Sequence, residues 1–152
     1  MSGVFSRFHK PTGVEYWDNA EDLDGELYRI LTNEKIVPKS RRFIYTIPIL
    51  NMMTHEWNYL SVAYDTYPSG DEAEEKLRKK KAALRKARDV NDAIIRQLQV
   101  MCLRHPEIDV DKLDRLGDLL SKESALLEKA RENSKVQKGR AKPQWFPKRK
   151  DG

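Results

Sequence analysis

The sequence predicts an all-α protein, folded as an antiparallel up-down four-helix bundle, and three observations support this prediction. Apolar residues recur every three or four positions along four separate stretches, which is the spacing of one face of an α-helix. The connections between these stretches are short and contain Pro, Gly or Asn. The chain has 152 residues, of which 35% are charged and 39% hydrophobic. This composition suits one slim domain with much surface for its core.

An irregular N-terminal arm, residues 1–18, is expected to precede a bundle domain of residues 19–133. The arm contains Gly, Pro and scattered aromatic residues without a helical period. The first helix is predicted from Asn19 to Asn33, because Asn33 and then Pro38 mark a helix end. Its apolar face consists of Leu23, Leu27, Ile30 and Leu31.

A second helix is predicted from Ser40, a plausible N-cap, to Tyr64. Pro48 conflicts with a continuous helix, because an interior proline removes a backbone hydrogen bond and clashes with the preceding turn. Two alternatives follow: the helix kinks at Pro48, or residues 41–47 form a separate turn and the helix proper begins near Pro48. The apolar residues of this stretch at helical spacing are Ile47, Leu50, Met53, Trp57, Leu60 and Tyr64.

A turn at residues 67–70 leads into a third helix, predicted from Asp71 to Arg104 with an acidic first turn. Its seam is heptad-like, and Asn91 is the polar member that is expected to fix the register. The seam residues are Leu77, Leu84, Ala87, Asn91, Ile94, Leu98 and Met101.

His105 and Pro106 break the third helix, and Asp109 or Asp111 can cap a fourth, predicted from Val110 to Asn133. The apolar spacing here is carried by Leu113, Leu116, Leu120 and Leu127. The remaining residues, 134–152, have no apolar period and are rich in Lys, Arg, Gly and Pro. They are expected to form a basic tail that is disordered until bound.

The most informative charge feature is residues 76–88, in which eight of thirteen residues are Lys or Arg and none is acidic. Although the chain has a net charge of +5, residues 131–152 alone carry eight basic and two acidic residues, and the preceding part carries 21 and 22. The basic run is therefore a local stripe on a nearly neutral body. Such a stripe favours a polyanionic partner. The alternative is a solvated face with pairing such as Glu74 to Arg78 and Glu75 to Lys79.

The sequence predicts a nucleic-acid surface with two secondary regions. The predicted phosphate contacts of the basic run are Arg78, Lys79, Lys80, Lys81, Arg85, Lys86 and Arg88. Secondary candidates are Arg41 and Arg42, which open the second helix. In the tail, Lys148, Arg149 and Lys150 follow Trp145 and Phe146. Cations interleaved with aromatic rings can bind phosphates and stack on bases, so the tail is expected to bind nucleic acid or a protein partner. A flexible solubilising tail is the alternative.

Catalytic and metal motifs are weak, and no enzyme activity, cofactor or metal site is expected. His55-Glu56 lacks the second histidine of an H-E-x-x-H zinc site, and Cys102 with His105 supplies only two of four zinc ligands. These residues are interpreted as a core thiol and helix histidines. A single cysteine, the lack of an apolar run of about 18 residues and the lack of a signal-peptide core predict a cytoplasmic protein without a membrane segment.

The second-helix entry Ile36-Val37-Pro38-Lys39-Ser40-Arg41-Arg42-Phe43 resembles that of the accessory variability determinant family of diversity-generating retroelements. The long Leu- and Arg-rich third helix, the fourth-helix entry HPEIDVDKLDRLGDLL and the basic tail add to the likeness, which covers about residues 23–140. The chain departs from the family pattern at Ile44-Tyr45-Thr46-Ile47-Pro48 and lacks the Gly and Trp that often close the bundle.

The resemblance implies a non-catalytic four-helix bundle that assembles as a homopentamer. It also implies partners, namely the reverse transcriptase of the retroelement and its template RNA or complementary DNA, and a role in mutagenic reverse transcription. The bundle proteins encoded by intervening sequences of ribosomal RNA genes are similar in their Pro-Lys-Ser helix entry and are the competing assignment. That assignment implies a structural interaction module without a nucleic-acid function.

Overall fold

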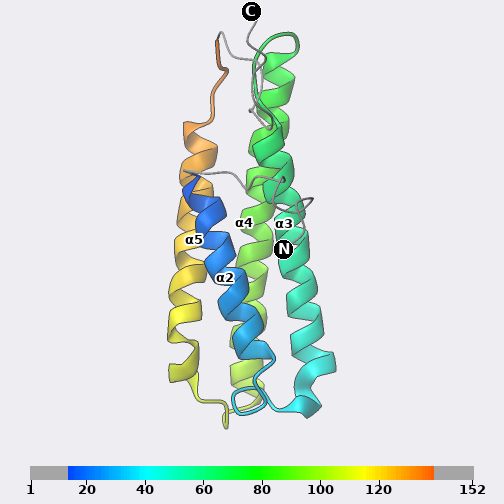
Figure 1. The fold of residues 1–152 in the computed structure, drawn as a ribbon, viewed down its shortest axis with the longest axis vertical. Helices are drawn as coiled ribbons and strands as arrows, with labels where there is room; N and C mark the ends of the chain where they lie inside the picture. Colours follow the sequence, from blue (N-terminus) through cyan, green and yellow to red (C-terminus); the bar gives the residue numbers. More distant parts are fainter. Residues whose placement is uncertain (1–13, 139–152) are drawn as a thin grey trace, which may run out of the picture.

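The computed structural model describes residues 14–138 and confirms an all-α protein whose four helices pack as an antiparallel up-down bundle (Figure 1). The helices are α2 (Glu15–Leu31), α3 (Ile47–Asp65), α4 (Ala73–Arg104) and α5 (Asp114–Asn133). A 3₁₀ turn, η1 (Lys39–Arg41), and a π-helical turn, η2 (Arg42–Thr46), precede α3, and the 3₁₀ turn η3 (Val110–Leu113) precedes α5. Residues 1–13 of the expected arm lie outside the described residues.

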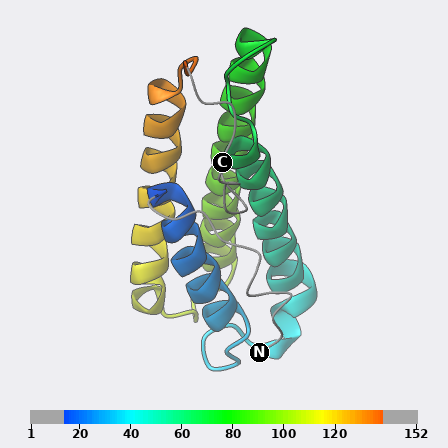
Figure 2. The same cartoon turned by 45° about the horizontal axis from the view of Figure 1, so that its top comes forward.

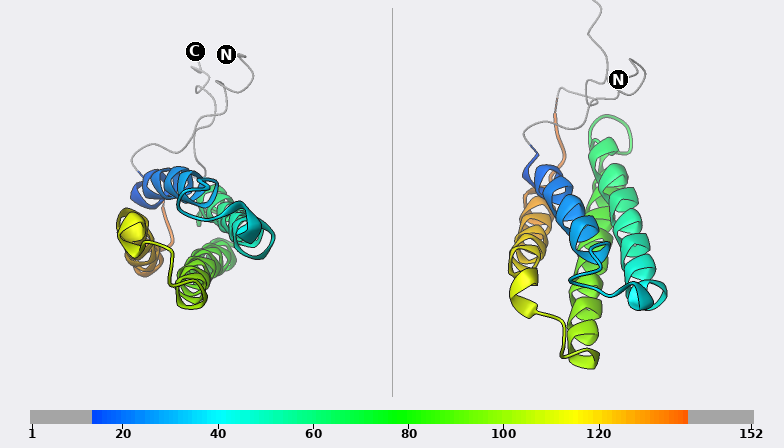
Figure 3. Two further views of the ribbon diagram at one scale, coloured as in Figure 1. Left: turned by 90° about the horizontal axis from the view of Figure 1, so that it is seen from below. Right: turned by 60° about the horizontal axis from the view of Figure 1, so that its bottom comes forward.

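The four helices form a ring in which α3 packs on α4, α4 on α5, α5 on α2, and α2 on α3. The view along the bundle shows this ring, with α2 opposite α4 and α3 opposite α5 (Figure 3). Helix α2 crosses obliquely, from α5 at its start towards α3 at its end (Figures 1 and 2). Side chains on the inner faces of all four helices therefore meet in one core.

Helix α2 begins at Glu15, four residues earlier than the sequence pattern predicted. Glu15 and Asp18 place carboxylates in its first turn, where the helix dipole favours negative charge. The Trp17 ring packs on the Trp57 ring of α3 with centroids 5.1 Å apart. The predicted apolar face of this helix is confirmed, because all four of its leucine and isoleucine side chains are fully buried.

The second of the two alternatives for Pro48 is confirmed, because the regular helix α3 begins at Ile47. Pro48 lies in the first turn of α3, directly after the π-helical turn, whose Arg42 carbonyl accepts a hydrogen bond from the Ile47 amide. The prediction of Ser40 as N-cap is wrong: Ser40 lies inside η1 and makes no capping hydrogen bond. The hydroxyl of Thr46 ties this entry segment to α2 by donating to the Leu31 carbonyl at 2.8 Å.

The buried face of α3 is rotated from the predicted one. Ile47 is 47% exposed, whereas Ile49, Met53, Leu60 and Ala63 are buried. The difference arises because the large rings of Trp57 and Tyr64 lie at the edge of the face, towards Trp17, and the smaller side chains fill its centre. The predicted α4 seam is confirmed from Leu84 to Met101; Leu77 is half-buried.

The α3–α4 hairpin projects beyond the ends of α2 and α5 (Figure 1). Helix α4 has 32 residues and is about 48 Å long, whereas α5 has 20 residues. After α5, residues 134–138 continue along the hairpin, and the Gln137 amide donates to the Pro68 carbonyl at 2.8 Å. The first part of the predicted tail is therefore ordered; residues 139–152 lie outside the described residues.

Candidate nucleic-acid interface

Two cations of the basic run point inward and close the end of α3. The Lys80 ammonium donates to the carbonyls of Ala63, at 2.5 Å, and Thr66, at 3.4 Å, and its burial lowers the pKa of Lys80. The Lys76 ammonium donates to the Ser69 carbonyl at 3.1 Å. A cation suits the negative end of the α3 dipole, so these two lysines serve the fold first.

The two arginines Arg78 and Arg88 are paired with carboxylates. Arg78 contacts Glu75 one turn earlier on α4. Arg88 reaches across to α5, where its Nη1 lies 2.6 Å from Glu128 Oε2. Hydrogen bonds from Arg131 and Arg88 lower the pKa of Glu128 to about 2, although partial desolvation opposes them. Arg88 thus stabilises the α4–α5 contact.

Four cations of the predicted site have no carboxylate partner among the described residues. They lie on the outer side of α4 and are Lys79, Lys81, Arg85 and Lys86; we call this group the α4 cation face. The Lys86 ammonium lies 5.8 Å from the centroid of the Tyr59 ring on α3, which places an aromatic side chain beside the charges. The face runs along the α3–α4 hairpin towards the Arg88–Glu128 pair with α5, where a long ligand can reach it.

The secondary candidates Arg41 and Arg42 lie at the opposite end of the bundle, beside the end of α4. Arg41 is 3.9 Å from Glu107, and Arg42 is 3.4 Å from Glu34. They join the α2–α3 connection to neighbouring segments and are not brought together with the α4 cation face. The tail candidates Lys148, Arg149 and Lys150 lie outside the described residues.

Sequence reasoning missed a polar layer at the centre of the bundle, to which every helix contributes one residue. This interior polar layer consists of Asn19 of α2, Glu56 of α3, Asn91 of α4 and Glu123 of α5. Burial, together with the charges of Glu123 and Asp92, raises the pKa of Glu56 to about 9, and burial raises that of Glu123 to about 8. The available signal was spacing, because Glu56 falls between Met53 and Leu60 on the core face of α3.

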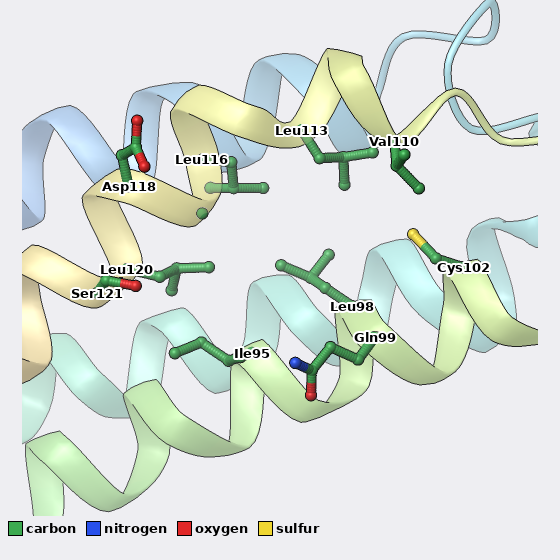
Figure 4. A pocket seen from close by; sticks show the side chains of 11 residues that line it. Ile95, Leu98, Gln99, Cys102, Val110, Leu113, Leu116, Asp118, Leu120 and Ser121 are labelled. Carbon is green, nitrogen blue, oxygen red and sulfur yellow. The ribbon is translucent and has the colours of Figure 1, made fainter.

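An apolar groove of about 400 Å³ lies between α4 and α5 (Figure 4). Ile95, Leu98 and Cys102 of α4 face Leu113 and Leu116 across it. Burial raises the pKa of the Cys102 thiol, which favours its neutral form. The groove offers apolar contact and no convergent charged groups.

No group of three or more His, Cys, Asp or Glu side chains in residues 14–138 is arranged to hold a metal ion. Cys102 lines the groove, whereas the His105 ring lies against Tyr45, whose hydroxyl is 3.1 Å from Nε2. None of the helices described for this chain combines the length and apolarity needed to cross a membrane.

A second exposed feature is apolar. Phe43, Ile44 and Ile47, at the entry to α3, are 85%, 56% and 47% exposed; we call them the α3 entry patch. Of the three, only Ile47 belonged to the predicted apolar face of the second helix. Neighbouring exposed apolar side chains of this kind often mark contact surfaces.

No protein-family model, curated protein or solved structure matches this chain. The four-helix architecture is therefore supported by the structure alone. The family likeness is supported only by residues 36–43 and the other motifs of the sequence.

Proposed function

We propose that this chain is a non-catalytic accessory protein of a diversity-generating retroelement, which binds template RNA or complementary DNA and docks the reverse transcriptase. The observation that carries the nucleic-acid part is the α4 cation face: four cations without carboxylate partners, grouped over little more than two helical turns. Unpaired cations attract a polyanion. Each cation that neutralises a phosphate releases a counterion that was condensed on the nucleic acid, and this release favours binding.

The local geometry favours a single-stranded ligand. Lys81 and Arg85 are one turn apart on α4, and Lys79 and Lys86 are two turns apart, so the cations form a short track with one pair on each flank of the outer side of the helix. Tyr59 beside Lys86 supplies a ring on which a base can stack. Asp89 follows the track and limits its length.

The test is to replace Lys79, Lys81, Arg85 and Lys86 together by Gln and to measure single-stranded RNA binding at several salt concentrations. If each cation neutralises one phosphate, the negative slope of log K against log salt should become less steep by about 3 in the variant. The affinity at low salt should also fall. Lys80 and Arg88 are left in place because they stabilise the fold.

A matched control replaces four exposed cations elsewhere by Gln: Lys35, Lys112, Lys122 and Lys129. This variant loses the same net charge, so RNA binding that tracks total charge alone would fall equally in both proteins. Equal losses, or an unchanged salt slope in the first variant, would overturn the proposed surface.

The retroelement role rests on the resemblance of residues 36–43 and makes a separate prediction. The gene should lie beside a reverse transcriptase gene with template and variable repeats, and the two proteins should co-purify. Homopentamer formation, which the resemblance also implies, is checked by light scattering on the full chain. A gene inserted in a ribosomal RNA operon would favour the competing family.

The α3 entry patch supports a second candidate function, a protein-interaction module without nucleic-acid binding. Replacing Phe43 and Ile44 by Ser should then abolish partner capture, whereas the Gln variant of the α4 cation face should retain it. If instead the reverse transcriptase is captured normally by the Ser variant, the patch is not its docking surface.

A further inference from the structure

The interior polar layer contains more hydrogen-bond acceptors than the surrounding groups can satisfy. Asn19 contributes two hydrogens through Nδ2, one to the Leu119 carbonyl and one to Glu123 Oε1, both at 3.0 Å. An amide group carries only these two hydrogens, so Asn19 has none left to donate.

The second amide of the layer is used up in the same way. Asn91 Nδ2 donates to the Leu120 carbonyl and to Ser124 Oγ, both at 2.8 Å. The Ser124 hydroxyl has one hydrogen, which it donates to Asp92 Oδ1 at 2.7 Å. Both amides of the layer, which lie on the α2–α4 diagonal, have therefore spent their hydrogens on backbone carbonyls and neighbouring side chains.

Four buried oxygens of the layer have no hydrogen-bond partner within the described part of the chain: Glu56 Oε1, Glu56 Oε2, Glu123 Oε2 and Asn91 Oδ1. Glu56, Glu123 and Asn91 are each 0% exposed, so bulk water does not reach these atoms. An unsatisfied buried acceptor is costly, and an unpaired buried carboxylate is more costly still. Hydrogens must come from a source other than the amides.

Among residues 14–138, no cation compensates the two carboxyl groups. The ionisable groups of the described residues whose fields act within the layer are acids or phenols from all four helices: Tyr16, Glu56, Tyr64, Asp65, Asp92 and Glu123. Arg88 touches the rim of this cluster at 3.9 Å from Asp92, but it is engaged with Glu128.

We propose that the interior polar layer is a proton-binding site, in which the Glu56 and Glu123 carboxyl groups are held as neutral acids whose O–H groups donate to the unpartnered oxygens. Two bound protons convert two acceptors into donors and so supply the missing hydrogens. They also remove the charges that would repel each other across the α3–α5 diagonal. The protons form part of the folded structure, as a structural ion does elsewhere.

The raised pKa values, about 9 for Glu56 and about 8 for Glu123, agree with this assignment. Their ordinary value is 4.5, so the folded state holds these protons over a pH range in which the unfolded chain has lost them. The stabilisation is complete below about pH 4.5 and is lost as the pH rises through about 8 to 9. The layer therefore makes the bundle sensitive to alkaline pH.

A direct test follows the side-chain carboxyl carbons of the ¹³C-labelled full-length protein by NMR from pH 4 to pH 10. Two carboxyl signals, assigned by the single variants Glu56→Gln and Glu123→Gln, should titrate near pH 8 to 9. Titration of both signals below pH 6 would overturn the proposal.

Thermal unfolding supplies a second test that does not require assignments. Glu56→Gln replaces the acid by an amide that always carries hydrogens, so its Tm should exceed that of the wild type by at least about 3 °C at pH 8.5. The two Tm values should converge at pH 5. The matched control Glu132→Gln changes an exposed carboxylate of α5 and should leave the alkaline slope unchanged.

Cations provide the competing explanation for an acceptor-rich layer. A proton site predicts that EDTA, Mg²⁺ and Zn²⁺ leave the wild-type Tm at pH 7 unchanged. A metal-dependent rise in Tm that Glu56→Gln abolishes would replace the proton by a metal ion and overturn the proposal.

Discussion

Glu123 and Glu128 lie five residues apart on α5, yet the pKa values of their carboxyl groups move in opposite directions. Burial in the interior polar layer raises that of Glu123 to about 8, against a single hydrogen bond from Asn19. At the α4–α5 edge, hydrogen bonds from Arg131 and Arg88 lower that of Glu128 to about 2. Neighbours in space, on the same helix or on another, set the charge of a residue type that the sequence presents identically.

The comparison also shows how this bundle separates its charges. At the α4–α5 edge, two arginines, Arg88 and Arg131, both donate hydrogen bonds to the one carboxylate of Glu128. In the interior polar layer, by contrast, there are fewer donor hydrogens than acceptor oxygens. A buried polar group is tolerated only when it is hydrogen-bonded, so the two regions should respond differently to the loss of one partner.

The largest effect is expected from Asn91→Ala, which removes the hydrogens that satisfy the Leu120 carbonyl and Ser124 and leaves a cavity. The free energy of unfolding should fall by about 3 kcal/mol, measured by urea denaturation. Asn51→Ala, at an exposed position of α3, is the control and should change stability by less than about 0.5 kcal/mol. Equal values for the two variants would mean that the layer contributes nothing to stability.

A smaller effect is expected for a cation that turns inward. Lys80→Met keeps the aliphatic stem but removes the donors to the Ala63 and Thr66 carbonyls, which should cost about 1 to 2 kcal/mol in the free energy of unfolding. Its neighbour Lys81 has no such contact, and Lys81→Met should be neutral in stability while weakening RNA binding. The opposite pattern would show that the inward and outward positions had been exchanged.

Glu128→Gln tests the edge by pH. The pKa of Glu128 lies below its ordinary value of 4.5, so its ion pairs contribute fully above about pH 4.5 and lose their contribution as the pH falls towards about 2. The variant should therefore have a lower Tm than the wild type at pH 7, and the difference should vanish near pH 2. Glu56→Gln should show the reverse dependence, with a Tm above that of the wild type at alkaline pH. If the Tm difference from the wild type changed with pH in the same direction for both variants, the two carboxyl groups would not be in opposite environments.

The smallest effect on stability is expected at the α3 entry patch. Phe43→Ser removes a side chain that is 85% exposed and should change the free energy of unfolding by less than about 0.5 kcal/mol. Its effect should appear in self-association, measured by light scattering. A destabilised monomer would show that Phe43 packs within its own chain.

The periodic spacing of leucine and isoleucine was enough to predict the four helices, because apolar burial repeats with the helical turn. Asn91 was also predictable as a polar seam residue. Glu56 and Glu123 were not recognised as a pair, because they are 67 residues apart in sequence. Their proximity depends on how α3 and α5 are aligned relative to each other in the bundle. The inward turn of Lys80 depended likewise on how α4 packs against the end of α3, which the spacing along one helix does not show.

The projection of the α3–α4 hairpin has a consequence for how the protein moves. Near its tip each helix has one helical neighbour instead of two, so its amide hydrogens should exchange with solvent sooner than those beside the interior polar layer. The α4 cation face begins near this tip and extends to the part of α4 that α5 covers, next to the Arg88–Glu128 pair. A ligand held there can stiffen the tip while the centre of the bundle keeps its packing.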